Sequence, residues 1–133
     1  MREKKPDKKR ALALLNAARN DIEFTLSLKI TDESSPTIVR NIYESFRMLG
    51  EALLIAKGFE SSVHQDALKE LYNLNAEMER PVRIIENLKT IRDNINYRGY
   101  LATKKDANEA VSIAKDLFNP IYIAAEKAIS ERK

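Results

Sequence analysis

The spacing of apolar residues constrains this chain more than any other feature of its sequence. Apolar side chains recur every three or four residues in five successive stretches, a pattern typical of helices with one buried face. The 133 residues include only 3 glycines and 4 prolines, so few positions break a helix. We therefore expect a single all-α domain, an up-and-down bundle of about five helices spanning residues 1–133.

The predicted helices are bounded by residues that commonly start or stop helices. They cover roughly residues 7–31, 35–57, 63–74 and 81–98, with a fifth from residue 103 onward. Gly58 and Gly99 are expected to end the second and fourth helices in the left-handed conformation. Pro120 lies inside the fifth helix and is expected to kink it, because proline cannot donate to the carbonyl of Asp116.

Three of the helix starts carry capping residues. Ser35, followed by proline, is expected to cap the second helix through its hydroxyl. Ser62 and Gln65 resemble a capping box at the third helix, and Thr103 and Asp106 mark the start of the fifth. In the fourth helix the core-facing residues are predicted to be Val82, Ile85, Leu88, Ile91 and Ile95.

The positive charge of the chain is concentrated in a basic N-terminal arm, at about residues 1–8. Residues 1–10 contain six basic and two acidic residues, so the remainder is close to neutral despite the overall charge of +3. An arm of this kind can contact phosphates. A solvated, frayed terminus is the simpler interpretation of the same residues.

Several functional classes are excluded or disfavoured by composition. The chain has no cysteine, which excludes disulfides and thiolate metal sites, and no metal site or cofactor is predicted. No apolar run approaches the ~20 residues that cross a bilayer, and the charged N-terminus lacks the apolar region of a secretory signal. These features predict a cytoplasmic protein without a membrane partner.

Polar side chains gather at the end of the fourth predicted helix, in the stretch L-K-T-I-R-D-N-I-N-Y-R-G-Y at residues 88–100. The candidate functional residues there are Arg92, Asp93, Asn94, Asn96, Tyr97 and Tyr100. Several hydrogen-bonding groups beside the glycine that ends a helix form a plausible site. His64 is the only histidine and falls in the first turn of the third helix, where a surface or capping role is expected and a catalytic role is the alternative.

Three segments of the chain together resemble the HEPN (higher eukaryotes and prokaryotes nucleotide-binding) domain family. They are I-Y-E-S-F-R-M-L-G-E-A-L-L-I-A-K-G-F-E at residues 42–60, S-V-H-Q at residues 62–65, and I-R-D-N-I-N-Y-R-G-Y with K-K-D-A-N-E-A at residues 91–100 and 104–110. They span most of residues 38–118, and the order of the predicted helices fits the family over the whole chain.

The resemblance implies a bundle that forms a homodimer, with the motif helices of both protomers lining one cleft. Many family members are metal-independent endoribonucleases, and many act as toxins beside a small nucleotidyltransferase antitoxin. Their motif is an arginine followed, after four to six residues, by a histidine. The arginine would stabilise phosphate charge and the histidine would assist proton transfer. The resemblance also implies that Glu44 or Glu51 orients the arginine.

Arg92 matches the motif arginine, Asp93 or Asn94 matches the polar position that often follows it, and Tyr97 stands where the histidine is expected. Tyrosine has a pKa near 10, so at neutral pH it donates hydrogen bonds but is a poor general base. Loss of the histidine is expected to lower turnover about 10²–10⁴-fold or to abolish it. His64 could replace it only if the fold brings it to Arg92.

Helix geometry also bears on the motif. Residues five apart are rotated by roughly 140°, so Arg92 and Tyr97 share a face only where the helix unwinds, whereas Arg92 and Asn96 share a face of an intact helix. Arg92, Asn96 and either Tyr97 or Tyr100 are expected to form a cleft that binds phosphate or nucleotide. The alternative is that Arg92 only satisfies a glutamate across the bundle.

The resulting functional prediction is an RNA- or nucleotide-binding protein of toxin–antitoxin type, with weak or absent endoribonuclease activity. One alternative is a non-catalytic helical subunit that binds partners or substrates for a small nucleotidyltransferase. Another is an active RNase in which Tyr97 or His64 replaces the usual histidine.

Overall fold

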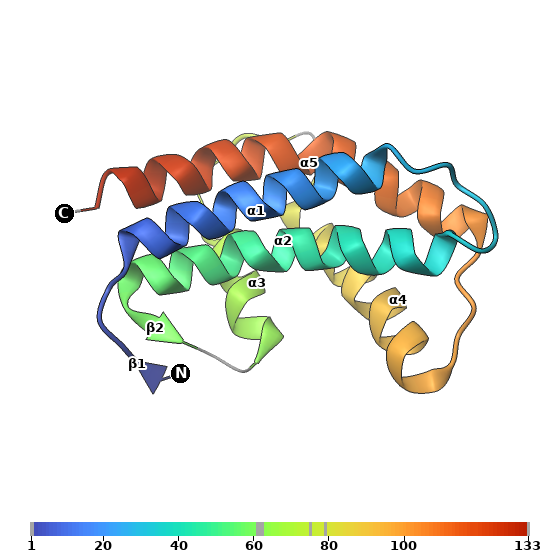
Figure 1. Cartoon of the computed structure of the whole chain (residues 1–133), viewed down its shortest axis with the longest axis horizontal. Coiled ribbons are helices and arrows are strands. Elements are labelled where there is room, and N and C mark those ends of the chain that lie inside the picture. Colours follow the sequence, from blue (N-terminus) through green and yellow to red (C-terminus); the bar gives the residue numbers. More distant parts are fainter. Residues whose placement is uncertain (1, 61–62, 75, 79, 133) are drawn as a thin grey trace.

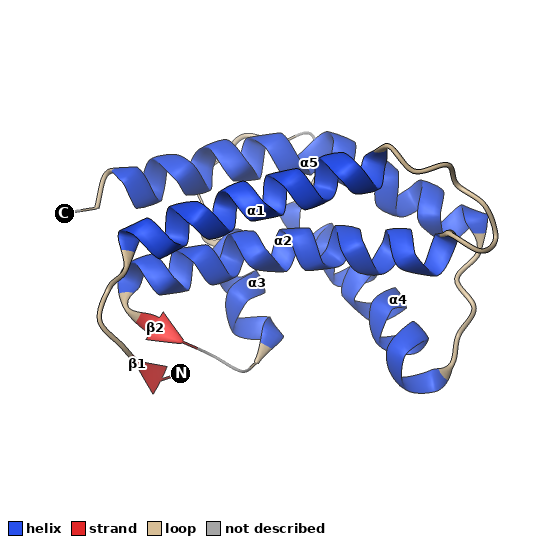
Figure 2. Cartoon of the chain, in the orientation of Figure 1, coloured by secondary structure: helices blue, strands red, loops and turns tan. Residues whose placement is uncertain are grey.

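The computed structural model describes residues 2–60, 63–74, 76–78 and 80–132. Within them the chain forms five α-helices, one 3-10 turn and a pair of two-residue strands, which confirms the predicted all-α bundle (Figures 1 and 2). The α-helices are α1 (Lys8–Leu26), α2 (Ser35–Lys57), α3 (His64–Tyr72), α4 (Ile85–Arg98) and α5 (Lys104–Ser130). The short elements are the 3-10 turn η1 (Val82–Ile84) and the strands β1 (Arg2–Glu3) and β2 (Phe59–Glu60).

Helix α2 is the centre of the bundle, since it contacts each of the other four α-helices. Helix α1 runs antiparallel to α2, whereas α5 runs in the same direction as α2 (Figure 1). Helices α3 and α4 are shorter and extend from α2 on its lower side in this view. Neighbouring helices cover α2 on most sides, and many of its residues are accordingly apolar and buried. The largest fully buried side chains include Tyr43, Phe46, Ile38, Ile42, Leu49 and Leu54 of α2.

The predicted helix ends at Gly58, Gly99 and Thr103 are confirmed. Gly58 and Gly99 adopt φ angles of 90° and 68°, in the left-handed region that glycine tolerates best. Thr103 and Asp106 form the reciprocal capping box: the threonine hydroxyl accepts from the Asp106 N–H, and the carboxylate accepts from the Thr103 N–H at 2.9 Å. Helix α5 continues through Pro120 as one element, and the kink expected there stays a prediction.

Two predictions about helix ends were wrong. Helix α1 stops at Leu26 rather than near residue 31. The prediction extended too far because Leu28 and Ile30 continue the apolar spacing, although they pack on the core after the helix has ended. Ser35 does not cap α2 from outside. It is the first helical residue, and its buried hydroxyl donates to the Thr31 carbonyl at 2.5 Å. Of the capping box expected at α3, Ser62 lies outside the described residues, and α3 begins at His64.

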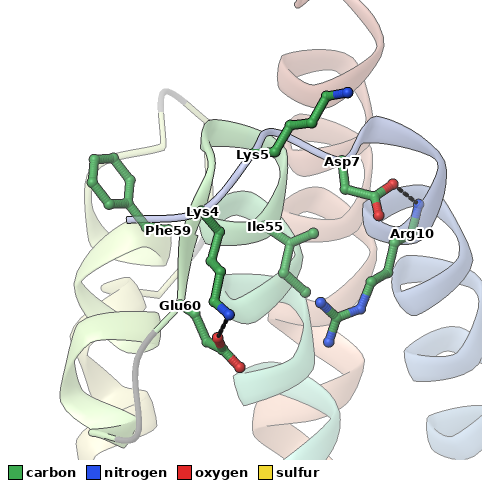
Figure 3. Close-up of a pocket in the computed structure, with 7 residues that line it drawn as sticks. All are labelled: Lys4, Lys5, Asp7, Arg10, Ile55, Phe59 and Glu60. Atoms are coloured by element: carbon green, nitrogen blue, oxygen red, sulfur yellow. Dashed lines mark hydrogen bonds and ion pairs between the residues drawn. The ribbon is translucent and has the colours of Figure 1, made fainter. Parts of the chain in front are cut away.

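The N-terminal arm is docked on the bundle, contrary to the expected frayed terminus. Strand β1 pairs antiparallel with β2, the Lys4 N–H donates to the Gly58 carbonyl at 2.6 Å, and the Asp7 N–H donates to the Ile55 carbonyl. The Lys4 ammonium also forms an ion pair with Glu60 (Figure 3). The side chains of the arm remain exposed, as expected, but backbone hydrogen bonds hold the arm to the chain that leaves α2.

Candidate functional site

Arg92 occupies a core-facing position of α4. The buried residues of this helix are Ile85, Leu88 and Arg92, at a spacing of three and then four, whereas Ile91 and Ile95 are only partly buried. Ile91 and Ile95 pack against the core as the stripe predicts, but in the last turns of α4 the fully buried position belongs to the arginine. Arg92 is only 7% exposed. A charged side chain buried to this extent requires partners that compensate for the loss of water.

The partners of the Arg92 guanidinium come from three helices. Its Nη2 lies 2.8 Å from Nδ1 of His64 in α3, and its Cζ lies 4.6 Å from the ring centroid of Tyr43 in α2. Within α4, Nη1 approaches the Tyr97 hydroxyl at 3.5 Å and Nη2 forms an ion pair with Asp93 at 3.2 Å. The Nε atom is buried without a hydrogen-bond partner among the described residues. Arg92 is thus held by an imidazole and an aromatic face from two other helices, and by the Asp93 carboxylate within its own helix.

The contact between Arg92 and His64 fixes the protonation of the imidazole. Arginine carries only donors, so Nδ1 of His64 must accept and, in the neutral ring, the proton must reside on Nε2. The Tyr43 hydroxyl lies 3.2 Å from the same Nδ1. Burial lowers the pKa of His64 below 6.5, and the charges of Arg47 and Arg92 lower it further. The neutral imidazole is therefore the form that the folded chain favours.

Close packing of α3 on α2 brings His64 to this position. A β-carbon at Gly50 would overlap the backbone carbonyl of Ala67, so only glycine allows α3 to approach α2 so closely. Tyr43 precedes Gly50 by two helical turns, and His64 precedes Ala67 by about one. His64 begins α3, as expected for a residue of its first turn, but it is half-buried against Tyr43 and Arg92 and does not lie free on the surface.

The two glutamates expected to orient Arg92 interact with a different arginine. Glu44 and Glu51 both form ion pairs with Arg47, at 2.6 Å and 3.4 Å. Each glutamate lies about one turn of α2 from this arginine. Burial raises the pKa of Glu51, and the charge of Arg47 partly offsets this effect. The carboxylate that pairs with Arg92 is that of Asp93, its neighbour in sequence. The alternative prediction, that Arg92 only forms an ion pair with a glutamate across the bundle, is therefore also wrong.

A polar cleft of about 290 Å³ opens beside Arg92, between α2 and α4. Its lining residues are Arg40, Asn41, Tyr43, Glu44, Arg92 and Asn96. Arg92 and Asn96 thus share a face, as the helical spacing predicts. Two guanidinium groups and two amides supply the donors that a phosphate group accepts, while Glu44 contributes one carboxylate.

The remaining predicted residues divide between the cleft and the helix end. Tyr97 is 75% exposed yet contacts Arg92 without unwinding of α4, because two long side chains bridge the angle between their positions. Asn94 acts through its backbone, accepting from the N–H groups of Gly99 and Tyr100. The Tyr100 hydroxyl donates to Asp106 at 2.6 Å, a contact that raises the pKa of Tyr100 and joins it to the start of α5.

Sequence reasoning missed Tyr43 and Arg40. Tyr43 of α2 is fully buried, and its ring lies beneath the Arg92 guanidinium. Arg40 lies one turn earlier on α2, exposed at the cleft. The spacing of three between Arg40 and Tyr43 places both on one face of a helix, which is the only signal that the sequence offers.

A second hollow of about 290 Å³ lies under the N-terminal arm (Figure 3). It is lined by Lys4, Lys5, Asp7, Arg10, Ile55, Phe59 and Glu60. The acids here have partners within the group, since Glu60 pairs with Lys4 and the Asp7 carboxylate accepts from the Arg10 N–H at 3.0 Å. These contacts fix the start of α1 and the arm, so the hollow is a consequence of how the arm docks.

Neither a metal centre nor a membrane span is seen in the part of the chain that the structure describes. No three side chains of the His, Cys, Asp and Glu types lie together there, and none of the described helices is both long and apolar enough to cross a bilayer. Comparisons of the chain with protein-family models, with curated proteins and with solved structures found no match. The resemblance to the HEPN family therefore rests on the sequence motifs and the helix order.

Proposed function

We propose that the chain is a HEPN-type RNA- or nucleotide-binding protein of toxin–antitoxin type, with weak or absent endoribonuclease activity. The observation that carries this proposal is the cleft in which the buried Arg92 meets Arg40 and Asn96. Paired guanidinium groups recognise phosphate by charge and by their planar donors. The motif-like stretch around Arg92, in a helix order similar to that of the family, points to RNA as the phosphate-bearing ligand.

Weak or absent cleavage follows from the groups available for proton transfer. Tyr97 offers a phenol hydroxyl, a group that donates hydrogen bonds but is a poor general base at neutral pH. In the unliganded chain the basic nitrogen of His64 accepts a hydrogen bond from Arg92 at 2.8 Å, so no free imidazole base faces the cleft. An imidazole that RNA displaced from Arg92 would be protonated by solvent and act as a donor, so bound RNA would meet charge stabilisation without an available general base.

RNA binding by the purified protein tests this proposal, with Arg40→Gln as the main variant. Arg40 is exposed, so its loss removes one donor from the cleft without opening the core. The matched control is Arg19→Gln. It removes the same charge from α1, where the Arg19 guanidinium lies over the ring of Tyr122 in α5. We expect Arg40→Gln to weaken binding of single-stranded RNA about five- to tenfold and Arg19→Gln to weaken it less than about twofold. Equal effects of the two variants would contradict binding at the cleft.

A second candidate is a non-catalytic interaction subunit, for example one that binds partners or substrates for a small nucleotidyltransferase. It is favoured by three exposed side chains in and just after the last turn of α4, those of Tyr97, Tyr100 and Leu101. Exposed apolar groups beside the cleft also suit a homodimer in which the α4 helices face each other. Stable co-purification with a nucleotidyltransferase that survives Arg92→Ala would support this candidate. A monomer that binds neither partner nor RNA would contradict both.

A further inference from the structure

We propose that His64 is the positioning residue of the cleft, and that an anionic ligand binds by taking the place of His64 as the acceptor of Arg92. The imidazole released in this exchange takes up a proton on Nδ1 and donates it in a hydrogen bond to the ligand. This inference rests on the proposed function and names how that site is regulated: binding becomes coupled to one proton.

The geometry places two acceptors in competition for one donor. Nη2 of Arg92 points to Nδ1 of His64 at 2.8 Å, and Arg92 itself lines the cleft that a phosphate would enter. A phosphate oxygen carries charge and accepts more strongly than a neutral imidazole nitrogen. Exchange of the acceptor keeps the guanidinium paired throughout, so a buried cation is never left without a partner.

The charges around His64 explain why the imidazole is neutral before a ligand binds. From α2 it faces Arg47 and Glu44 as well as the Tyr43 hydroxyl, and from α4 it faces Arg92 and Lys89. Asp66 lies two residues away in its own helix. Three cations against one facing carboxylate oppose a further positive charge, and burial opposes it as well. A bound phosphate would reverse this balance.

The proton balance of the step is simple. Before binding, Nδ1 holds no proton and Nε2 holds one. After binding, the imidazolium holds both, and the additional proton comes from solvent. By linkage, a ligand that binds with uptake of a proton binds more tightly at lower pH, by at most about tenfold per pH unit.

The test measures affinity from about pH 7.5 to about pH 5.5, where histidine titrates. The probes are inorganic sulfate, which is a tetrahedral dianion like phosphate, and a short oligouridylate without terminal phosphates; neither probe changes charge in this range. We expect wild-type affinity for both probes to rise about three- to tenfold on acidification. His64→Gln supplies an amide acceptor for Arg92 but cannot take up a proton, so its affinity should not change with pH.

Glu51→Gln is the matched control, because burial raises the pKa of Glu51 and this carboxyl could also titrate near the lower limit. The pH dependence should persist in this variant. If it disappears in Glu51→Gln and persists in His64→Gln, the assignment to His64 is overturned.

The single histidine also gives a direct readout by NMR, since one imidazole produces one titration curve. Saturating inorganic sulfate should raise the pKa of His64, and without ligand Arg92→Gln should move it toward 6.5. An unchanged histidine curve in both experiments would overturn the proposal. A protein that takes up sulfate in this way but binds no RNA at any pH would refute the proposed function and leave the role of His64 standing.

Discussion

The backbone carbonyl of Ala67 in α3 lies directly over Gly50 of α2, in the space that a β-carbon would occupy. This contact sets the distance between the two helices. It therefore determines whether His64, one turn before Ala67, reaches Arg92 across the surface of Tyr43. The cleft chemistry thus depends on a glycine that is not among the residues lining the cleft.

Replacement of Gly50 by alanine should displace α3 from α2. We expect a loss of about 1–3 kcal/mol in the free energy of unfolding, the usual cost of overpacking a core. The His64 NMR signal should shift toward that of an unperturbed histidine, because its contacts with Tyr43 and Arg92 lengthen. Urea unfolding and the histidine titration measure the two effects. Gly99→Ala is the control. Apart from the adjoining chain, no atom of the described residues lies within 4 Å of its β-carbon position, so this substitution should lower stability while leaving His64 unchanged.

Two substitutions of Arg92 should differ in their effect on the free energy of unfolding but not in their effect on RNA binding. Arg92→Met preserves much of the buried volume and removes a charged guanidinium whose Nε has no hydrogen-bond partner among the described residues. We therefore expect the free energy of unfolding to change by less than about 1.5 kcal/mol. Arg92→Ala leaves a cavity beside Tyr43 and should cost about 2–4 kcal/mol. Both variants should lose affinity for RNA. An RNA affinity that Arg92→Met retains would show that the guanidinium is not a ligand contact.

Stability should fall as the pH is lowered through the titration of His64. The pKa of this residue is lowered on folding, so below about 6.5 the unfolded chain binds a proton that the folded chain does not. The stability that the neutral imidazole contributes is complete above 6.5 and is lost as the pH falls through the folded pKa. Glu51, with a raised pKa, acts in the opposite sense. Urea unfolding of wild type and His64→Gln at matched pH isolates the histidine, and parallel curves would contradict this prediction.

The docked N-terminal arm predicts an unequal effect of alanine at two glycines. Gly58 and Gly99 both have positive φ, so each should lose about 1 kcal/mol when replaced. At Gly58 the new β-carbon would also meet the Lys4 carbonyl at 2.6 Å, and the arm must move away. Gly58→Ala should therefore cost more than Gly99→Ala in urea unfolding. Removal of residues 2–6 should abolish the difference, and a difference that survives would show that the arm is not its cause.

Much of the fold could be predicted from the sequence because the signals are local. Gly58, Gly99 and the Thr103–Asp106 box act within a few residues of themselves, and the structure confirms each of them. The end of α1 could not be predicted in this way, because Leu28 and Ile30 keep the apolar spacing of a helix while packing on the core from an irregular segment.

The candidate site was predicted only in part. Arg92 and Asn96 share the cleft as their spacing indicates. The glutamates of α2 pair instead with Arg47, since that arginine lies within one turn of both and needs no tertiary contact to reach them. The role of Tyr43 could not be predicted, because the sequence does not show that α3 and α4 both pack on α2 and cover this residue.

By itself the sequence determined the helical class, most of the helix limits and the motif-like stretch around Arg92, because periodicity and capping are properties of neighbouring residues. Only the tertiary structure decided that Arg92 is buried, that Tyr43 lies beneath it and that His64 reaches it. That meeting joins residues 28 positions apart. It depends on how closely α3 approaches α2 at Gly50, a distance set by steric contact between helices.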